Sequence, residues 1–280
     1  GWIKFCEHYY PEFLDNLSTC KSPQQMFGAV AKTYYAQKMG IDPSKIFVVS
    51  IMPCTAKKFE AQRPEMNSSG YQDVDVALTT RELSRMLKEA GIDVSKLPDE
   101  EFDDPLGIST GAGAIFGATG GVMEAALRTV YEVVTGKELQ NIEFTSVRGV
   151  EGIKEATIDV DGTKVNVAVA HGLSNARKVL DRVKNGEANY HFIEIMCCPG
   201  GCVGGGGQPI LSSEERWDTD YREVRGNAIY EVDRSMKLRK SHENPAVQTL
   251  YKEFLGKPLS EKSHHLLHTH YTKRPLYPEV

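Results

Sequence analysis

The sequence predicts an α/β fold with mostly parallel sheets flanked by helices, followed by a helical C-terminal segment. Two observations indicate this. Up to Pro209, short runs rich in β-branched residues alternate with amphipathic stretches, as in strands joined by helices. Beyond Pro209 the amphipathic stretches follow one another without a strand between them. The 280 residues, 40% hydrophobic and 25% charged, have the composition of an ordinary globular protein with a sizeable core.

The first forty residues are expected to be helical. Ser22 at a cap position, Pro23 in the first turn and Gln25 at the capping-box position indicate a helix start. Gly40 indicates where this helix ends, because glycine readily adopts the left-handed conformation of a helix C-terminus.

Two strands are expected next. The β-branched and aromatic run at 45–52 predicts a strand buried on both faces, which is typical of a parallel sheet. Residues 74–79 predict a second strand, with Thr79 or Thr80 capping an amphipathic helix over 81–90.

The glycine-rich segment 111–121 is expected to be a loop that leads into a helix ending near Val134. Asp161 and Gly162 form a strong hairpin turn signal between two short strands. The remaining predicted elements are the two hairpin strands at 156–159 and 165–170, a helix at 173–183, a strand at 190–196, and helices at 212–215, 221–236 and 244–255.

Composition excludes several classes of protein. No apolar run approaches the roughly 20 residues of a membrane helix, and no signal segment begins the sequence. The net charge of −5 gives no global reason to expect nucleic acid or a membrane as a partner. The first residue is Gly1, so we expect the numbered chain to be a fragment or a processed form.

The six cysteines point to metal chemistry rather than disulfides. A long chain without an export signal does not fit a disulfide framework, so a reducing, cytoplasmic compartment is expected. Cys54 and Cys198 each follow a predicted strand, and ligands of open α/β sheets lie beyond the carboxyl ends of strands. The two cysteines can therefore come together although 144 positions separate them in the sequence.

The segment 196–209 combines Cys198-x₃-Cys202 with several glycines. Glycine lets a backbone approach a large inorganic group closely. A metal site therefore fits this segment better than a tight glycine turn with buried thiols. Soft thiolates suit zinc, copper(I) and iron–sulfur clusters, but one cysteine pair plus the lone Cys54 fits a cluster better than structural zinc. A [4Fe–4S] cluster needs four cysteines, and these motifs supply three.

Lys57 lies three residues beyond Cys54. A lone lysine at a strand end is usually a solvated surface residue, whereas an ammonium beside a cluster cysteine is a point-charge donor for an anionic ligand. Cys197 should point away from Cys198 in an extended segment, which favours a core thiol. We interpret Cys6 and Cys20 as ordinary buried or half-buried thiols, and the histidines between 264 and 270 as surface residues.

Residues 52–60 and 194–209 closely resemble the second and third signatures of [FeFe]-hydrogenases. The first reads Met-Pro-Cys-x-x-Lys-Lys-x-Glu, and the second contains Cys198-x-Gly-Gly-Cys202 and ends in Gly-Gly-Gly-Gln-Pro. The resemblance covers essentially the whole chain and continues through residues 9–14, 21–25, 63–64, 111–121 and 240–244.

The resemblance implies a two-lobed catalytic domain that reversibly reduces protons to dihydrogen, with its cluster between the lobes. The cofactor would be the H-cluster, a [4Fe–4S] cubane joined to a di-iron subsite with CO, CN and azadithiolate ligands. By the match of motifs, Cys54, Cys198 and Cys202 are cubane ligands, and Cys202 bridges to the di-iron subsite. Lys57 matches the lysine that hydrogen-bonds a cyanide.

Other positions are carried over in the same way. Residues that pack around the di-iron subsite match Met52, Met196, Phe116 and Pro23, with Gln24 beside them. Ser18 matches a hydroxyl of the family's proton path. The implied partners are ferredoxin or a similar electron carrier, maturation proteins, and upstream iron–sulfur domains that this chain lacks.

The resemblance divides the chain into residues 1–208, an N-terminally incomplete H-cluster domain, and residues 209–280, which resemble a separate small subunit of some relatives. The family's first signature, with the fourth cubane ligand and a proton-relay cysteine, would precede Gly1. Two alternatives are a non-catalytic hydrogenase-like protein of iron–sulfur assembly and a hydrogen sensor. The run at 114–121, which the assembly proteins generally lack, favours the enzyme.

Overall fold

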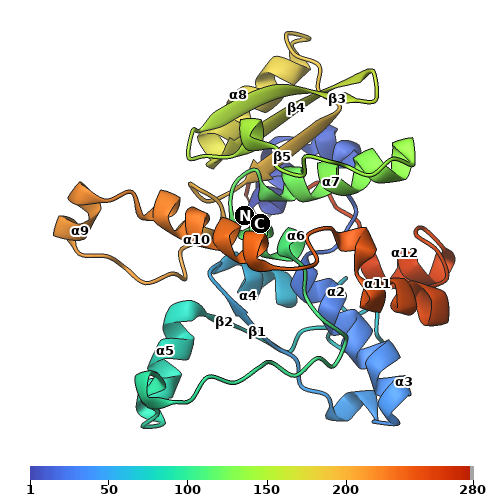
Figure 1. The fold of residues 1–280 in the computed structure, drawn as a ribbon, viewed down its shortest axis with the longest axis vertical. Coiled ribbons are helices and arrows are strands. Elements are labelled where there is room, and N and C mark those ends of the chain that lie inside the picture. Colours follow the sequence, from blue (N-terminus) through green and yellow to red (C-terminus); the bar gives the residue numbers. More distant parts are fainter. Residues whose placement is uncertain (278–280) are drawn as a thin grey trace.

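The computed structural model describes residues 1–277 and has two lobes (Figure 1). One lobe contains a three-stranded sheet, and the other contains a two-stranded parallel sheet. The first sheet combines one antiparallel and one parallel pairing. The helices α6 and α10 lie between the lobes in Figure 1. The expected α/β architecture is therefore confirmed.

The three-stranded sheet is formed by β3 (Ile153–Val160), β4 (Thr163–His171) and β5 (Phe192–Met196), in that order. The hairpin between β3 and β4 turns at Asp161 and Gly162, which both have positive φ, so the predicted Asp-Gly turn is confirmed. Helix α8 (Leu173–Lys184) connects β4 to the parallel β5.

Two helices cover the two faces of this sheet. On one face, Met123 and Leu127 of α7 (Gly121–Thr135) pack against Val167 and Val169 of β4. On the other face, Val179 of α8 packs among residues of β4 and β5 that include Ala168, Ala170, Ile193 and Ile195. This sandwich fixes the direction in which β5 leaves the lobe.

The second sheet pairs β1 (Val49–Met52) with β2 (Val76–Thr79) in parallel. Helix α4 (Ala56–Ala61) follows β1, and α5 (Thr80–Glu89) follows β2. Thr79 and Glu82 form a capping box at the start of α5, which confirms the predicted cap.

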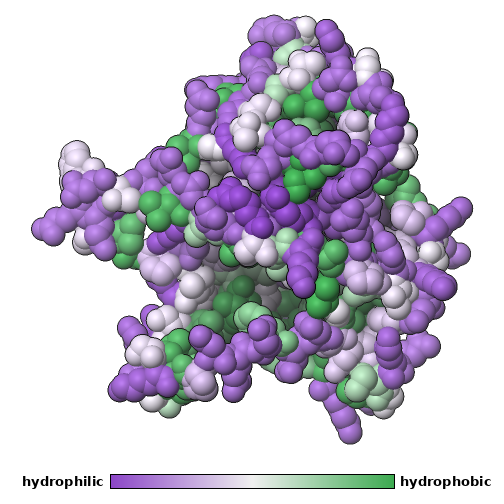
Figure 2. Space-filling view, viewed as in Figure 1, coloured by the Kyte–Doolittle hydropathy of each residue, from purple (hydrophilic) through white to green (hydrophobic). Residues whose placement is uncertain are grey.

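The expected burial of the first strand on both faces is wrong. Val49 is 46% and Ile51 is 41% exposed. The face of the two-stranded sheet that carries these side chains is therefore left partly uncovered by the described residues. In the space-filling view, hydrophobic surface lines a hollow in the lobe that contains this sheet (Figure 2).

The N-terminal region is helical as expected. It comprises α1 (Trp2–Tyr9), a 3₁₀ turn (Pro11–Asn16), α2 (Pro23–Val30), a π-helical stretch (Ala31–Tyr35) and α3 (Ala36–Met39), which ends at Gly40 with φ of 65°. The capping box expected at Ser22 does not form. Its hydroxyl donates to Glu60 Oε2 at 3.0 Å, and the buried Gln25 amide has no side-chain partner among the described residues.

The glycine-rich segment is more regular than predicted. It contains α6 (Gly111–Ala114) and a 3₁₀ turn (Ile115–Gly117) rather than a loop. The Thr110 hydroxyl caps α6 by accepting from Gly113 N at 3.2 Å. A Cβ at Gly111 would collide with Asp233 of α10, so the small residues let α10 pack closely enough to hold this segment.

The C-terminal segment is helical and contains no strand within residues 209–277. Its helices are α9 (Ser213–Asp218), α10 (Tyr221–Ser235), α11 (Pro245–Leu250), a π-helical turn (Tyr251–Leu255) and α12 (Glu261–Leu267), of which α12 was not predicted. Leu255, Leu266 and Leu267 pack against Val30 of α2. This contact fixes the end of the chain on the N-terminal helices.

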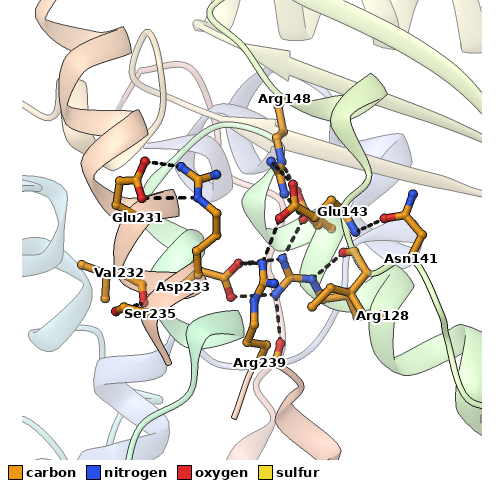
Figure 3. Close-up of polar contacts among 12 residues, drawn as sticks. Arg128, Asn141, Glu143, Arg148, Glu231, Val232, Asp233, Ser235 and Arg239 are labelled. Atoms are coloured by element: carbon orange, nitrogen blue, oxygen red, sulfur yellow. Dashed lines mark hydrogen bonds and ion pairs between the residues drawn. The ribbon is translucent and has the colours of Figure 1, made fainter. Parts of the chain in front are cut away.

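A buried ion network fixes α10 against α7. The Arg128 guanidinium of α7 donates to both carboxylate oxygens of Asp233 in α10 at 2.9 Å, and to Glu124 at 2.7 Å. All three side chains are fully buried. Arg239 and Arg148 complete the network, which Figure 3 shows between the two helices.

Among residues 1–277, none of the helices combines the length and the apolar character that a membrane span requires.

Candidate metal centre

Two strands from different lobes direct their following loops toward one place. Cys54 lies two residues beyond β1, and Cys198 lies two residues beyond β5. The loops are hydrogen-bonded to each other, since Gly207 N donates to Pro53 O at 2.8 Å. A Cβ at Gly205 would collide with the same carbonyl, so glycine is required for the loops to approach this closely.

The thiols that these loops carry influence one another. The hydrogen bond with Cys197, burial, and the nearby Cys54 and Cys202 all raise the pKa of the Cys198 thiol. Burial and then Cys54 raise the pKa of Cys202, against the opposing charge of Lys57. Three thiolates cannot easily share this place without a cation, and bound iron would reverse the shift by stabilising the deprotonated forms.

The loop between Cys198 and Cys202 is held from outside at Gly200. Its carbonyl accepts from Thr119 N at 3.0 Å, and its N–H donates to Nδ1 of His171 at 3.1 Å. Gly200 and Gly201 have φ of 78° and 95°, which glycine adopts without strain. Thr119 lies in the run at 114–121 that the sequence analysis noted, but without a role of its own, and His171 was not singled out because it belongs to no recognisable spacing.

Glu194 positions the segment that carries Thr119. Its carboxylate accepts from Gly120 N at 2.6 Å and from Met123 N at 2.7 Å, at the start of α7. Burial raises the pKa of Glu194, against the opposing effect of these N–H groups. Glu194 lies two residues before Met196 in β5, so one strand fixes both the helix start and the cysteine loop.

Lys57 and Gln24 meet at one carboxylate. Lys57 Nζ lies 2.7 Å from Glu60 Oε2, and Gln24 Nε2 donates to the same oxygen at 3.1 Å. Gln24 is buried, and its Oε1 accepts from the Ser50 hydroxyl at 2.7 Å. The structure thus brings together Lys57 and Gln24, both expected near the cofactor.

A cavity of about 290 Å³ borders this network. Its lining includes Cys54, Lys57, Met196 and Cys197, but not Cys198 or Cys202. Cys197 was expected to point away from the centre as a core thiol. Instead it lines this cavity, and its sulfur lies so close to Gly1 that a Cβ there would collide with it.

Besides Cys198 and Cys202, five predicted site residues do not line that cavity, namely Gln24, Met52, Phe116, Pro23 and Ser18. Met52 is half-buried at the end of β1, and Phe116 packs against the cluster that contains Ile115 and Tyr230. Pro23 is exposed. Ser18 is also exposed, and it lines a second cavity of about 530 Å³. This cavity shares five lining residues with the first: Trp2, Ile3, Cys20, Ile195 and Tyr271.

The remaining thiols differ in accessibility. Cys6 is fully buried, and burial together with the acidic Glu12 and Glu7 raises its pKa to about 12, so its thiolate is inaccessible at neutral pH. Cys20 is exposed, which differs from the expected buried or half-buried position.

One further cluster of side chains that could bind a metal ion is already paired with a lysine of the chain. Glu132, His242 and Glu243 approach one another closely enough to hold an ion. However, the Lys240 ammonium lies 2.6 Å from Glu132 and 3.1 Å from Glu243, so both carboxylates already have a cationic partner within the chain.

Two family models match the chain. Residues 1–206 match the model described as "Iron only hydrogenase large subunit, C-terminal domain". Residues 219–274 match "Iron hydrogenase small subunit".

Individual relatives agree with these matches. The chain is 55% identical over 274 residues to NADP-reducing hydrogenase subunit HndD of Solidesulfovibrio fructosivorans, covering 98% of this chain and 46% of that protein. It is 59% identical over 211 residues to the periplasmic [Fe] hydrogenase large subunit of Nitratidesulfovibrio vulgaris, covering 75% and 50%. The chain thus spans about half the length of these curated relatives.

Solved structures show the same fold. The apo [FeFe]-hydrogenase HydA1 from Chlamydomonas reinhardtii, variant C377H, matches with a TM-score of 0.83 and 42% identity, covering 99% of this chain and 75% of that one. A more distant relative is cytosolic iron-sulfur assembly component 3 of Rattus norvegicus, 35% identical, with 97% of this chain and 57% of that protein covered.

Proposed function

The chain belongs to the iron-only, or [FeFe]-, hydrogenase family, and we propose that it forms the catalytic domain of an enzyme that reversibly reduces protons to dihydrogen. The observation that carries the proposal is the meeting of the Cys54 loop with the Cys198–Cys202 loop from another lobe. Such a site assembles only in the folded chain, and its three soft donors suit iron and sulfide.

Cys54, Cys198 and Cys202 are the proposed thiolate ligands of a [4Fe–4S] cubane, with Cys202 also joining the di-iron subsite. The hydrogen bond between the two cysteine loops supports a shared occupant, and the soft thiolate donors favour an iron–sulfur cluster. When bound, the H-cluster with its CO, CN and azadithiolate ligands supplies the redox centre at which dihydrogen is made or split.

The chain's own residues hold and shield that centre. Lys57 carries a positive charge near Cys202. Its ammonium group can donate a hydrogen bond to an anionic ligand such as cyanide. Met196 lines the adjoining cavity together with Cys54. Gln24 anchors the network that holds Lys57. The proposal extends to Met52, Phe116 and Pro23 as residues that pack around the cofactor.

Ser18 is the proposed proton-path residue. It lines the neighbouring cavity, and its hydroxyl accepts from Cys20 N at 3.3 Å. A hydroxyl at such a position can accept and pass on a proton, because it is both a donor and an acceptor. The cavity that Ser18 lines shares Cys20 and Tyr271 with the cavity that Cys54 lines. The proposed proton path therefore adjoins the proposed metal centre.

The remaining parts of the proposal concern the whole protein. Residues 1–208 form the H-cluster domain, and residues 209–280 correspond to the small subunit. Electrons pass to ferredoxin or a similar carrier through upstream iron–sulfur domains, and maturation proteins insert the cofactor. A cytoplasmic location is supported by the six free cysteines. Cell fractionation tests it, and recovery of the protein in the periplasm would contradict it.

The alternative function is that of a non-catalytic iron–sulfur assembly adaptor. The 35% identity to cytosolic iron-sulfur assembly component 3 supports this alternative. The packed segment 114–121 favours the enzyme. There Ile115 is fully buried, Phe116 packs on the same cluster, and Gly201 approaches this segment too closely to accept a Cβ.

Infrared spectroscopy of the matured full-length parent tests the proposal. We expect bands from iron-bound carbon monoxide and cyanide together with hydrogen turnover. Cys202→Ala should abolish both, whereas Cys6→Ala, at a buried thiol distinct from the proposed ligands, should retain both. Iron–sulfur absorption without these bands would favour the adaptor. Turnover by Cys202→Ala would refute the bridging assignment.

A further inference from the structure

We propose that His171 is a positioning residue for the loop that carries Cys198 and Cys202. It holds the Gly200 amide and so sets how the two thiolates face the cluster. The inference rests on the proposed function for the identity of the cluster. It rests on geometry alone for the contact between the ring and the loop.

The ring is held in one orientation and one tautomer. His171 is the last residue of β4 and is 5% exposed. Its Nδ1 lies 3.1 Å from Gly200 N, and its Nε2 lies 3.0 Å from Val150 O. An amide N–H can only donate and a carbonyl can only accept, so Nδ1 is the acceptor and Nε2 carries the proton. The imidazole is therefore neutral, and both its nitrogens are satisfied.

The contact falls at the centre of the cysteine loop. Gly200 is two residues from Cys198 and two from Cys202. His171 holds its N–H, while Thr119 N donates to its carbonyl at 3.0 Å from the opposite element. Both peptide groups around this residue are thus clamped between β4 and the 117–119 segment. His171 is also paired with Met196 in the β4–β5 ladder.

The clamp has a chemical consequence for the cluster. Hydrogen bonds from backbone amides to the sulfurs of an iron–sulfur cluster help to set its reduction potential. While Gly200 N–H points at His171, that amide is not available to a thiolate or a sulfide. Without the acceptor, the buried amide would need a new partner, and on this proposal a cluster sulfur supplies it.

Two amide variants separate the contacts of the ring. His171→Asn places an oxygen near the position of Nδ1, so it retains an acceptor for Gly200 and loses the donor to Val150. His171→Gln places an amide nitrogen near the position of Nε2, so it retains the donor and loses the acceptor. His171→Leu loses both.

The readouts are the reduction potential and the electron paramagnetic resonance spectrum of the cluster in the matured full-length protein. We expect His171→Asn to match the wild type. His171→Gln and His171→Leu should have a more positive potential and altered g values. If His171→Gln matches the wild type while His171→Asn departs from it, the ring acts through Val150 and the proposal is wrong. If all three variants have the potential and the spectrum of the wild type, the proposal is also wrong.

A second measurement needs no cluster. In the apo protein, hydrogen exchange of the peptide that contains Gly200 should be about tenfold faster in His171→Gln and His171→Leu, as expected when one net hydrogen bond is lost, and unchanged in His171→Asn. Equal exchange in all variants would overturn the clamp even where maturation fails. Absence of any cluster signal from the wild type would instead count against the proposed function and leave this measurement decisive for His171.

Discussion

One carboxylate oxygen organises the residues around Lys57. Glu60 Oε2 accepts from Lys57 at 2.7 Å, from Ser22 at 3.0 Å and from Gln24 at 3.1 Å. The three donors come from α4 and from the start of α2. Glu60 therefore fixes the position of the lysine and joins the two helices, and a neutral amide could not attract all three donors as strongly.

Replacing Glu60 with glutamine tests this role. The side chains of Lys57 and Glu60 are only 23% and 22% exposed, so we expect Glu60→Gln to lower the free energy of unfolding by about 1–2 kcal/mol. Urea denaturation of the purified chain measures the change. Glu12→Gln is the matched control, because Glu12 pairs with Lys184 at an exposed site and its loss should hardly move the midpoint. Equal midpoints for the two variants would contradict the role of Glu60.

At this scale the sequence revealed some site residues and concealed others. Cys198 and Cys202 could be proposed as ligands because thiols at short spacing among glycines have few structural uses, and Cys54 because it follows a predicted strand. His171 could not be identified, because a single histidine at a strand end carries no pattern. Its role depends on Gly200, which meets it only after β4 and β5 pair in parallel.

Helix α7 connects the region of the Cys198–Cys202 loop with the C-terminal segment. At its start, the Glu194 carboxylate holds Gly120 and Met123. In its last turns, Glu132 accepts from the Lys240 ammonium at 2.6 Å, from His242 at 2.7 Å and from Leu139 N at 2.7 Å. The helix is therefore anchored by a buried carboxylate at one end and by a partly buried one at the other.

The anchor at Glu132 should be sensitive to pH. Burial alone would raise the pKa of Glu132, but Leu139 N–H, Lys240 and His242 outweigh burial and lower it from 4.5 to about 2. The stabilisation is then fully present above about pH 4.5 and is lost as the pH falls through about 2. We expect Glu132→Gln to cost about 1–3 kcal/mol near neutral pH, and progressively less at lower pH.

Chemical denaturation of both proteins at a series of pH values measures this difference. Comparing the wild type with Glu132→Gln at each pH cancels the titration of the other carboxylates. A difference that stays constant between pH 6 and pH 3 would show that Glu132 is not the titrating group.

Elements were predictable where local signals agree with the tertiary structure. The Asp161-Gly162 hairpin and the Thr79 cap follow from turn and cap chemistry within a few residues. The helix at 111–114 was missed because glycines normally disfavour helices, whereas here they admit α10. The exposure of β1 was missed because the sequence of a strand does not reveal whether other elements cover both faces of its sheet.

In the whole molecule, the C-terminal helices join the N-terminal helices to the lobe that contains the three-stranded sheet. The π-helical turn and α12 pack on α2, and α10 contributes Asp233 to the ion network of α7 (Figures 1 and 3). The Tyr230 ring of α10 also stacks under the Arg148 guanidinium, 4.3 Å from its centre. Arg225 of α10 donates to the carbonyl of Val203, the residue after Cys202, at 3.1 Å, so loosening α10 should also disturb the candidate metal centre.

Asp233→Asn tests this attachment. The change removes one of the two buried carboxylates that pair with the Arg128 guanidinium and leaves only Glu124, and breaking a buried ion pair typically costs about 3–5 kcal/mol. We expect a loss of that size in the free energy of unfolding, together with faster proteolysis of the segment before α10. Glu231→Gln is the matched control, because Glu231 lies in the same helix but pairs with Arg234 at the surface.

The control should leave both the unfolding midpoint and the proteolysis pattern unchanged, because exposed pairs contribute little. Adding salt distinguishes the two sites further. Screening weakens the Glu231 pair but reaches the buried Asp233 far less, so the destabilisation by Asp233→Asn should persist at 1 M NaCl, where the Debye length is about 3 Å. If the two variants unfold alike, or if salt abolishes their difference, the buried network does not hold α10 in place.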